Sequence, residues 1–383
     1  MTTLTRQSLL TEPAAPLPVL ANGQLIGLLR EAGLTGHGGA GFPTWRKLTA
    51  VAAGSRAVVI GNGAEGEPAS AKDKTLLTRA PHLVLDGLQL AATAVDASDC
   101  YLYLPAALVN HVRHAIATRR DHRPVTVVTA PDTFVAGEES AVIAGIGGAR
   151  PLPTDKRKLV VEAGLRGRPT LVQNVETLAH MAMIARHGPA WFRRHGTEAE
   201  PGTFLATVGG AVAAPGVHEV PYGIQLTDLL DLAGGPATRL SAVLVGGYHG
   251  TWLPRTDVPM SRTGLAPYGA TPGAGVVHAL PASYCGLMET ARITGYLANQ
   301  SARQCGPCRF GLPAMADSLH RLAAGERNRD LPRQVVALTG LVTNRGACHH
   351  PDGTVRLVRS ALTVFADEIG RHLAGRCSTM EER

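Results

Sequence analysis

The feature that most constrains the fold is a regular alternation of short apolar runs with helical segments between residues 20 and 200. Three runs have the length and composition of buried strands, and they begin at Ala57, Tyr101 and Val125. Residues 83–95 and 109–118 have the spacing of helices. We therefore predict an α/β domain over residues 20–200, with a mostly parallel sheet and helices on its faces. Ligands of such sheets bind beyond the carboxyl ends of the strands.

The rest of the chain has two other patterns. Residues 201–262 contain short strand-like runs, a short helix at 227–233 and glycine pairs, which indicate a small β-grasp-like unit. A connection rich in Gly, Pro and Thr follows at 264–275. From residue 280 to 383 apolar residues recur at helical spacing, and residues 361–373 are expected to form a final amphipathic helix. This last part predicts a helical bundle.

Composition excludes several classes of function. Six cysteines in 383 residues are too few for a disulfide framework, which favours a reducing cytoplasm. The net charge of +7 comes from scattered basic residues, so nucleic acid is not an expected partner. No apolar run is long enough to span a bilayer, and no secretory signal is recognised at the start.

A glycine-rich run extends from Gly36 to Gly41 and is followed by Phe-Pro-Thr. Glycines let the backbone approach a phosphate closely, and Pro43 suits the first turn of a helix, whose free N–H groups favour an anion. Lys47 would add charge neutralisation. A tight structural turn explains the same run equally well, and the run does not end as a P-loop does.

Two adjacent carboxylates, Glu138 and Glu139, follow Gly137. They could hydrogen-bond a ribose or the edge of an isoalloxazine ring. The alternative is the first turn of a helix, where acidic residues are favourable. For this run taken alone, the helix is the preferred interpretation.

Three cysteines near the C-terminus have the spacing of a metal centre. Cys305 and Cys308 can grip one metal centre, and Cys348 can reach it from a distant loop. The pattern is typical of an iron–sulfur cluster or a structural zinc, although three thiols are one short of the usual four. Cys100 and Cys285 are interpreted as core residues, and Cys377 as a free thiol near an exposed tail.

These runs occur in one order along the chain, together with Asn62–Pro68, Gly167–Thr170, Asn174–Thr177 and Trp191-Phe192. The ordered set resembles the flavin-bearing, NADH-oxidising F-subunit family of the respiratory NADH:quinone oxidoreductase. It is also similar to the matching subunits of NAD-dependent hydrogenases and formate dehydrogenases. The resemblance covers roughly residues 25–375.

The resemblance implies a Rossmann-like FMN/NADH-binding domain at 20–200, a β-grasp (ubiquitin-like) domain at 201–262 and a helical iron–sulfur-binding domain at 280–383. It implies FMN and a 4Fe–4S cluster as cofactors and NAD(H) as substrate. Cys305, Cys308 and Cys348 would bind the cluster, and Glu67 and Glu139 would be the catalytic carboxylates beside the nicotinamide. The positions that would bind FMN or NADH are Gly36, Gly38, Gly39, Gly41, Phe42, Lys47, Asn62, Glu65, Gly137, Glu138, Lys156, Asn174 and Thr177.

The chain departs from the family pattern at several of these contacts. Ala64 stands in place of an Asp and Phe134 in place of a Tyr, while Leu159 and Ala50 replace aromatic residues. Each lost aromatic stack costs on the order of 1 kcal/mol. We therefore expect weaker NADH binding with FMN binding unaffected.

The cluster motif departs as well, because Ala302 occupies the position of its first cysteine. Three alternatives follow. A cubane is held by three thiolates and a non-protein ligand, or a substitute ligand comes from Cys285, Cys377, His349 or His350, or the site is empty or holds zinc.

The sequence thus predicts an FMN-dependent flavoprotein that oxidises NADH and passes electrons through an iron–sulfur cluster. Its expected partners are a small ferredoxin-like iron–sulfur subunit and a larger oxidoreductase complex at the inner face of the cell membrane. The alternative is a non-catalytic or NADH-independent relay or docking subunit with degenerate nucleotide and cluster sites.

Overall fold

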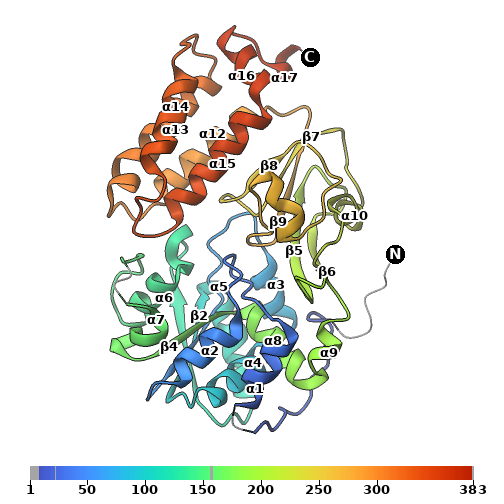
Figure 1. The fold of residues 1–383 in the computed structure, drawn as a ribbon, viewed down its shortest axis with the longest axis vertical. Coiled ribbons are helices and arrows are strands. Elements are labelled where there is room, and N and C mark those ends of the chain that lie inside the picture. Colours follow the sequence, from blue (N-terminus) through green and yellow to red (C-terminus); the bar gives the residue numbers. More distant parts are fainter. Residues whose placement is uncertain (1–7, 22, 156–157, 382–383) are drawn as a thin grey trace. The chain divides into compact units, whose positions relative to one another are not determined.

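The computed structural model describes residues 8–21, 23–155 and 158–381 and divides into two compact units (Figure 1). Unit 1 holds the residues up to Ala206 together with Glu219–Gly223. Unit 2 holds Thr207–His218 and the residues from Ile224 onward.

Unit 1 is built on a parallel sheet in the order β3-β2-β1-β4. Its strands are β1 (Val58–Asn62), β2 (Asp99–Pro105), β3 (Val125–Ala130) and β4 (Thr170–Asn174). The chain moves outward from β1 to β3 and then returns to the other side of β1 with β4. The strand order therefore reverses between β1 and β4, which is the point where α/β sheets of this kind bind their ligands. The predicted α/β class with a parallel sheet is confirmed.

Helices join these strands, and their bounds follow the sequence pattern closely. They are α1 (Gln24–Ala32), α2 (Thr44–Ala52), α3 (Lys72–Arg79), α4 (Pro81–Ala94), α5 (Ala106–Ala117), α6 (Glu139–Ile146), α7 (Val160–Ala163), α8 (Val175–His187) and α9 (Pro189–Phe192), with short turns η1 (Phe134–Gly137) and η2 (Leu165–Gly167). Pro81 starts α4, where its missing N–H costs nothing. Gly87 lets α4 and α8 cross closely, since a Cβ there would collide with the backbone of Leu178.

Unit 2 contains the sheet β6-β5-β9-β7-β8, and the division between the units falls within β5 and β6. Its strands are β5 (Thr203–Gly210), β6 (Gly216–Pro221), β7 (Leu240–Val245), β8 (Thr251–Leu253) and β9 (Val276–Pro281); α10 (Leu226–Leu232), α11 (Arg262–Leu265) and η3 (Ala266–Tyr268) lie between them in sequence. The first and last strands, β5 and β9, pair in parallel at the centre, and β7 pairs antiparallel with β9 and β8. This is the arrangement of a β-grasp unit. Strand β9 lies beyond residue 262, where the predicted small domain ends.

The remainder of unit 2 is helical, as predicted. It comprises α12 (Gly286–Asn299), the π-helical turn η4 (Pro307–Gly311), α13 (Leu312–Ala323), α14 (Leu331–Val342), α15 (His350–Val364), α16 (Ala366–Leu373) and α17 (Ser378–Glu381). Helices α12 to α15 pack on one another around Leu287, Leu312, Leu319, Val335 and Val358. Within the described chain, no helix has the length and apolar content needed to cross a membrane.

The prediction of one final helix over residues 361–373 is wrong. The chain leaves helical geometry at Phe365, with φ −106° and ψ 28°, and this residue separates α15 from α16. The Phe365 ring lies edge-on to Trp252, with centroids 5.3 Å apart, and fills the space above Gly286 that a side chain would otherwise take. Packing of one aromatic ring therefore overrides the helical periodicity.

Candidate functional site

The candidate site of unit 1 starts at the paired ends of β1 and β4. Asn62 is the last residue of β1, Asn174 is the last residue of β4, and the two are register partners. The switch in strand order lies between these two strands. Both predicted asparagines therefore stand where a parallel α/β sheet binds ligands.

Two loops meet beside Asn62. Its side-chain amide donates to the Gly137 carbonyl at 2.9 Å, and its carbonyl oxygen accepts from the N–H of Ala64 at 3.2 Å. A Cβ on Gly66 would collide with the backbone of Phe134, and one on Gly137 would lie 2.5 Å from the Ala64 carbonyl oxygen. The loop after β1 and the turn η1 are thus in backbone contact, which is why both carry glycine.

The glycine-rich run forms a closed loop. Gly36 donates to the Phe42 carbonyl at 2.9 Å, while Gly39 and Gly41 have φ values of 101° and 62° that favour glycine. The N–H of His37 donates to Thr177 Oγ1 of α8 at 2.9 Å and ties the loop to the end of β4. Among the residues that the structure describes, no carbonyl accepts in good geometry from the N–H groups of residues 38–41. These donors fit an anion such as a phosphate.

The adjacent carboxylates have separate partners. Glu138 caps α6, because its side chain accepts from the N–H of Ser140 at 2.8 Å and of Ala141 at 3.2 Å. The interpretation as a helix start is therefore right for Glu138. Glu139 instead accepts from Lys47 Nζ of α2 at 2.8 Å, and the two side chains are 24% and 26% exposed. The predicted cation and the predicted catalytic carboxylate thus form an ion pair that solvent can reach.

A buried ionic network that was not predicted from the sequence supports Asn174. Lys72 Nζ lies 2.7 Å from Asp73 Oδ1 and 2.8 Å from Glu176 Oε2. Asn174 donates to Asp73 at 2.7 Å and caps α8 by accepting from the N–H of Glu176 at 2.9 Å. Burial alone would lower the pKa of Lys72, but the Asp73 and Glu176 carboxylates hold it above its ordinary value. Of the three charged residues in this network, only Glu176 lies in a motif recognised from the sequence, the Asn-Val-Glu-Thr run.

The other two predicted carboxylates lie on the loop after β1. Glu65 accepts from the Ser70 hydroxyl, and burial together with the Asp73 carboxylate raises the pKa of Glu65 to about 7. Glu67 accepts from the N–H of Ala69 at 3.1 Å. Glu65 therefore keeps its proton to a higher pH than an ordinary glutamate does, and the loop holds both side chains in place.

Two stacked histidines lie beneath the glycine loop, and neither was selected from the sequence. His37 and His180 are buried, with ring centroids 4.6 Å apart. Burial lowers the pKa of both imidazoles, so both are neutral at pH 7. His37 Nε2 lies 3.2 Å from the Thr203 carbonyl oxygen. The pair fills the space under the loop without adding charge.

Two apolar side chains are exposed, one just before α2 and one just before α7. These two helices pack on each other. Phe42 is 46% exposed and Leu159 is 59% exposed. Ala50, the second aliphatic replacement, is also exposed, on α2. Among the described residues, the surface predicted to flank NADH therefore offers one aromatic ring, Phe42, and two aliphatic side chains, Leu159 and Ala50. Lys156, also predicted to bind there, lies outside the described residues.

The three predicted cluster cysteines come together in unit 2. Cys308 lies on the π-helical turn η4, a type of turn often found at functional sites. Burial alone would raise the pKa of Cys305, but N–H groups of Cys308 and Ala347 and the Cys308 thiol bond to its sulfur and lower it. Burial, then the nearby Cys305 and Cys348 thiolates, raise the pKa of Cys308 to about 12. The 305–308 turn and the loop carrying Cys348 thus meet.

Three of the four proposed substitutes for Ala302, namely His350, Cys285 and Cys377, are engaged in other contacts, whereas His349 directly follows Cys348 in sequence. His350 is buried, with Nε2 2.8 Å from the Leu297 carbonyl and Nδ1 3.1 Å from His249, while the side chain of His349 is fully exposed. Cys285 precedes α12, and the cluster turn follows it. The 14-residue helix α12, about 21 Å long, lies between them in the chain. Cys377 is a free cysteine, as predicted, but it is buried, with only 6% of its surface exposed. Cys100 is buried on β2, as predicted.

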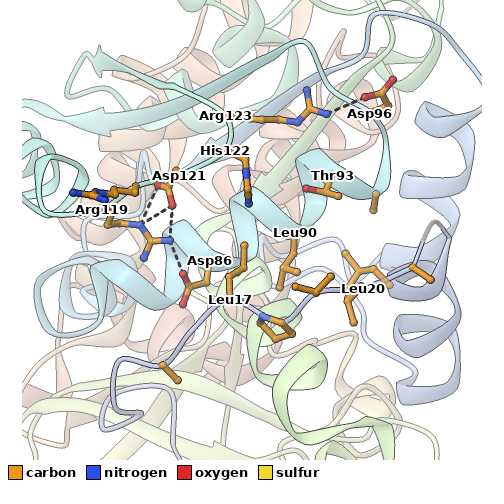
Figure 2. A pocket seen from close by; sticks show the side chains of 17 residues that line it. Leu17, Leu20, Asp86, Leu90, Thr93, Asp96, Arg119, Asp121, His122 and Arg123 are labelled. Carbon is orange, nitrogen blue, oxygen red and sulfur yellow. Dashed lines mark hydrogen bonds and ion pairs between the residues drawn. The ribbon is translucent and has the colours of Figure 1, made fainter.

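A separate cavity of about 660 Å³ lies in unit 1 and involves none of the predicted residues (Figure 2). It is bounded by the segment 15–21, by α4 and by residues 119–123. Arg119 on its wall lies 2.6 Å from Asp86 and 2.8 Å from Asp121. The charges on this wall therefore neutralise one another, and the cavity is distinct from the site at β1 and β4.

Comparison with known families matches both parts of the chain. Residues 29–183 match the Nuo51 FMN-binding domain, and residues 288–372 match the iron–sulfur binding region of NADH-ubiquinone oxidoreductase-F. An NADH-quinone oxidoreductase F subunit of Rhizobium meliloti (strain 1021) is 33% identical over 92% of this chain and 89% of its own length. The corresponding F subunit of Escherichia coli (strain K12) is 28% identical over 91% and 84%.

Two solved structures are similar to this chain over most of its length. An NAD+-reducing [NiFe]-hydrogenase in the H2-reduced state superposes with a TM-score of 0.86 at 30% identity, over 91% of this chain. The air-oxidized state of the enzyme gives a TM-score of 0.85 at 31% identity. This chain spans 62% of the length of each hydrogenase chain.

Proposed function

Because this chain belongs to the F-subunit family of NADH-quinone oxidoreductase, we propose that it binds FMN, oxidises NADH and passes the electrons through an iron–sulfur cluster to a partner protein. The observation that carries this proposal is the convergence of four distant segments at the paired ends of β1 and β4. They are the glycine loop, the loop after β1, the Gly137–Glu139 turn and the start of α8.

The residues present fit FMN. The N–H groups of residues 38–41, with Lys47 nearby on α2, suit its phosphate, and the start of α8 adds a helix N-terminus at the same edge. Asn62, Glu65, Gly137, Glu138, Asn174 and Thr177 are proposed to complete the pocket. Gly66 and Gly137 keep side chains out of the contact between its loops.

NADH is proposed to lie against this pocket. When bound, FMN supplies the acceptor for the hydride and returns the electrons one at a time. Phe42 would pack on the dinucleotide, and Glu67 and Glu139 would position the nicotinamide by hydrogen bonds. The Lys47–Glu139 ion pair fixes the direction of the Glu139 carboxylate before substrate arrives. Lys156 would contact the dinucleotide.

The cluster site fits an iron–sulfur centre with three protein thiolates. Hydrogen bonds to the sulfur of Cys305 favour the thiolate that iron requires. With Ala302 in place of a fourth cysteine, and with His350, Cys285 and Cys377 engaged in other contacts, we propose that Cys305, Cys308 and Cys348 hold the 4Fe–4S cluster. The remaining iron would then take a non-protein ligand.

A second candidate function is an NADH-independent electron relay. The relay is supported by Leu159 and Ala50, which present aliphatic groups to solvent where the family resemblance implies aromatic rings. In this case FMN would bind and accept electrons from another donor.

The relatives' names describe subunits of an oxidoreductase. We propose that this chain works in such a complex, with a small ferredoxin-like iron–sulfur subunit as its immediate partner. We further propose that the complex places it at the cytoplasmic face of the membrane.

The test is reconstitution of the full chain with FMN under anaerobic conditions. The proposal predicts about one flavin per chain and a variant Asn62→Ala that binds FMN less tightly, with His82→Ala, at the start of α4, as a matched control. A chain that folds but takes up no FMN would contradict it.

A further inference from the structure

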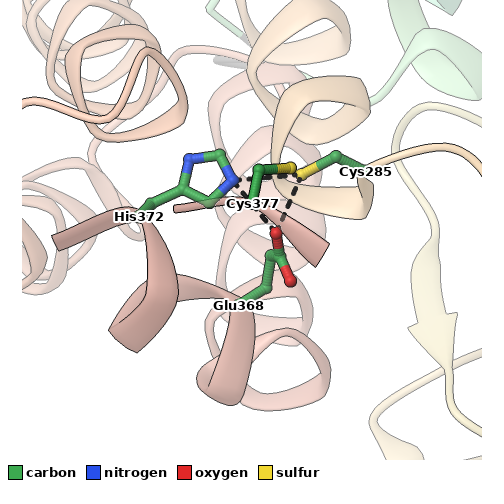
Figure 3. Close-up of side chains that lie close together, drawn as sticks. All are labelled: Cys285, Glu368, His372 and Cys377. Carbon is green, nitrogen blue, oxygen red and sulfur yellow. Dashed lines mark hydrogen bonds and ion pairs between the residues drawn. The ribbon is translucent and has the colours of Figure 1, made fainter. Parts of the chain in front are cut away.

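A second group of metal-binding side chains lies in unit 2, apart from the three cluster cysteines. Cys285, Glu368, His372 and Cys377 converge, and one ligand atom from each lies within 4.8 Å of all the others (Figure 3). Cys285 immediately precedes α12, Glu368 and His372 lie one turn apart on α16, and Cys377 follows that helix. The two cysteines and the histidine are buried.

Two of the distances in this group match the edges of a small tetrahedron, and the third is slightly shorter. Cys285 Sγ lies 3.5 Å from His372 Nε2 and 3.8 Å from Glu368 Oε1, and His372 Nε2 lies 3.1 Å from that oxygen. Zinc bonds of about 2.3 Å to sulfur and about 2.0–2.2 Å to nitrogen or oxygen place neighbouring tetrahedral ligands roughly 3.3–3.8 Å apart. A cubane cluster binds its ligands on different irons and holds them farther apart.

The surroundings also orient the group for a metal. His372 Nδ1 lies 3.2 Å from the Leu322 carbonyl oxygen, which can only accept, so a neutral imidazole that donates from Nδ1 leaves the Nε2 lone pair for a metal. Metal-bound histidines usually have such a hydrogen bond on the other ring nitrogen. The N–H of Ser378 donates to Glu368 Oε1 at 3.0 Å, and Arg371 lies 3.8 Å from the other carboxylate oxygen.

We propose that Cys285, Glu368, His372 and Cys377 form a structural zinc site. Two thiolates, one imidazole and one carboxylate give the four ligands of a closed tetrahedral site, with no position left for substrate. Zinc binding would release the two thiol protons to solvent. The ion would hold the segment after α16 against the start of α12, two parts of the chain that are far apart in sequence. It would therefore stabilise the helical part of unit 2.

The decisive measurement uses the full chain purified anaerobically, with zinc and iron counted by mass spectrometry and the zinc environment determined by X-ray absorption. The proposal predicts one zinc per chain with two sulfur neighbours and two nitrogen or oxygen neighbours. Absence of zinc would overturn it. So would a zinc shell with three sulfurs, since that shell belongs to Cys305, Cys308 and Cys348, or a Cys285–Cys377 disulfide in the anaerobic protein.

Variants of these side chains test whether they bind the zinc. Cys377→Ser and His372→Gln should lower zinc occupancy at least tenfold and lower the melting temperature. Cys100→Ser, at a buried cysteine of unit 1, should keep zinc. The double variant Cys305→Ser/Cys308→Ser should lose iron and keep zinc, and loss of both metals from it would contradict separate sites. If the ligand variants fail to fold, the absorption spectrum of the unmodified chain still decides.

Discussion

Asn62 and Asn174 are register partners at the ends of two neighbouring parallel strands, yet each amide is held by a different part of the chain. Asn62 donates to Gly137 in the turn before α6, and Asn174 donates to Asp73 at the start of α3. The carboxyl ends of β1 and β4 are therefore fixed by contacts with two segments that lie between these strands in sequence. Changes at either residue should disturb cofactor binding and stability together.

Asn174→Ala should destabilise unit 1 by about 1–2 kcal/mol, because it removes the cap of α8 and the donor to Asp73. Asn174→Ser is the matched control, since serine keeps a cap and loses only the donor. Chemical unfolding of both variants measures the difference. Equal stability of the alanine variant and the unmodified chain would exclude a capping role.

Lys72→Met should cost on the order of 3–5 kcal/mol, because it leaves the Asp73 and Glu176 carboxylates buried without their cation. Lys74→Met lies two residues later on the same helix at an exposed position and should change stability by less than about 0.5 kcal/mol. Thermal unfolding compares the two. A small effect at Lys72 would show that the buried charges are satisfied in another way.

We expect the buried carboxyl group of Glu219 to make the free energy of unfolding depend on pH. Its carboxylate accepts from the Leu9 N–H and from the Thr203 hydroxyl, each at 2.7 Å, and burial raises its pKa to about 7 from an ordinary 4.5. Between pH 4.5 and 7 the unfolded chain releases this proton before the folded chain does. Stability is therefore full below pH 4.5 and falls as the pH rises to about 7.

The variant Glu219→Gln isolates this group, because glutamine has the same shape and does not ionise; its carbonyl oxygen can accept from the Leu9 N–H while its amide donates to the Thr203 hydroxyl oxygen. Relative to this variant, the unmodified chain should lose about 2–3 kcal/mol between about pH 5 and pH 8. Unfolding at the two pH values provides the measurement. Parallel pH profiles would mean that Glu219 is not the titrating group.

Ala302→Cys should restore a fourth thiol near the cluster turn. We expect more iron retained per chain after exposure to air than in the unmodified chain, since the cluster would no longer present an open iron. The adjacent Arg303 has φ 54°, so Arg303→Gly in the same background relaxes the backbone of the turn and is a useful companion variant. Iron content and the electron paramagnetic resonance signal report the result. Unchanged retention in both variants would indicate that residue 302 does not face the cluster.

Much of the architecture of unit 1 was predictable, because buried strands and the helices between them carry local signals. The apolar runs at β1, β2 and β3 needed no knowledge of their neighbours. Glycine was informative where it marks close backbone contact, as at Gly66 and Gly137.

The features that were missed depend on contacts between distant residues. Lys72 reads as a surface lysine until Glu176 is brought beside it by the sheet. The break at Phe365 follows from packing on Trp252 and Gly286, which periodicity alone does not reveal. Cys285 and Cys377 were considered separately, as a core residue and a free thiol or as substitute cluster ligands, because nothing local indicates that they meet beside α16.

The most direct test of the proposed function is an anaerobic optical titration of the FMN-loaded chain with NADH. We predict that flavin absorbance is bleached by about one equivalent of NADH, and that Glu139→Gln raises the NADH concentration required while leaving FMN content unchanged. Flavin that dithionite bleaches but excess NADH does not would contradict NADH oxidation and favour the NADH-independent relay.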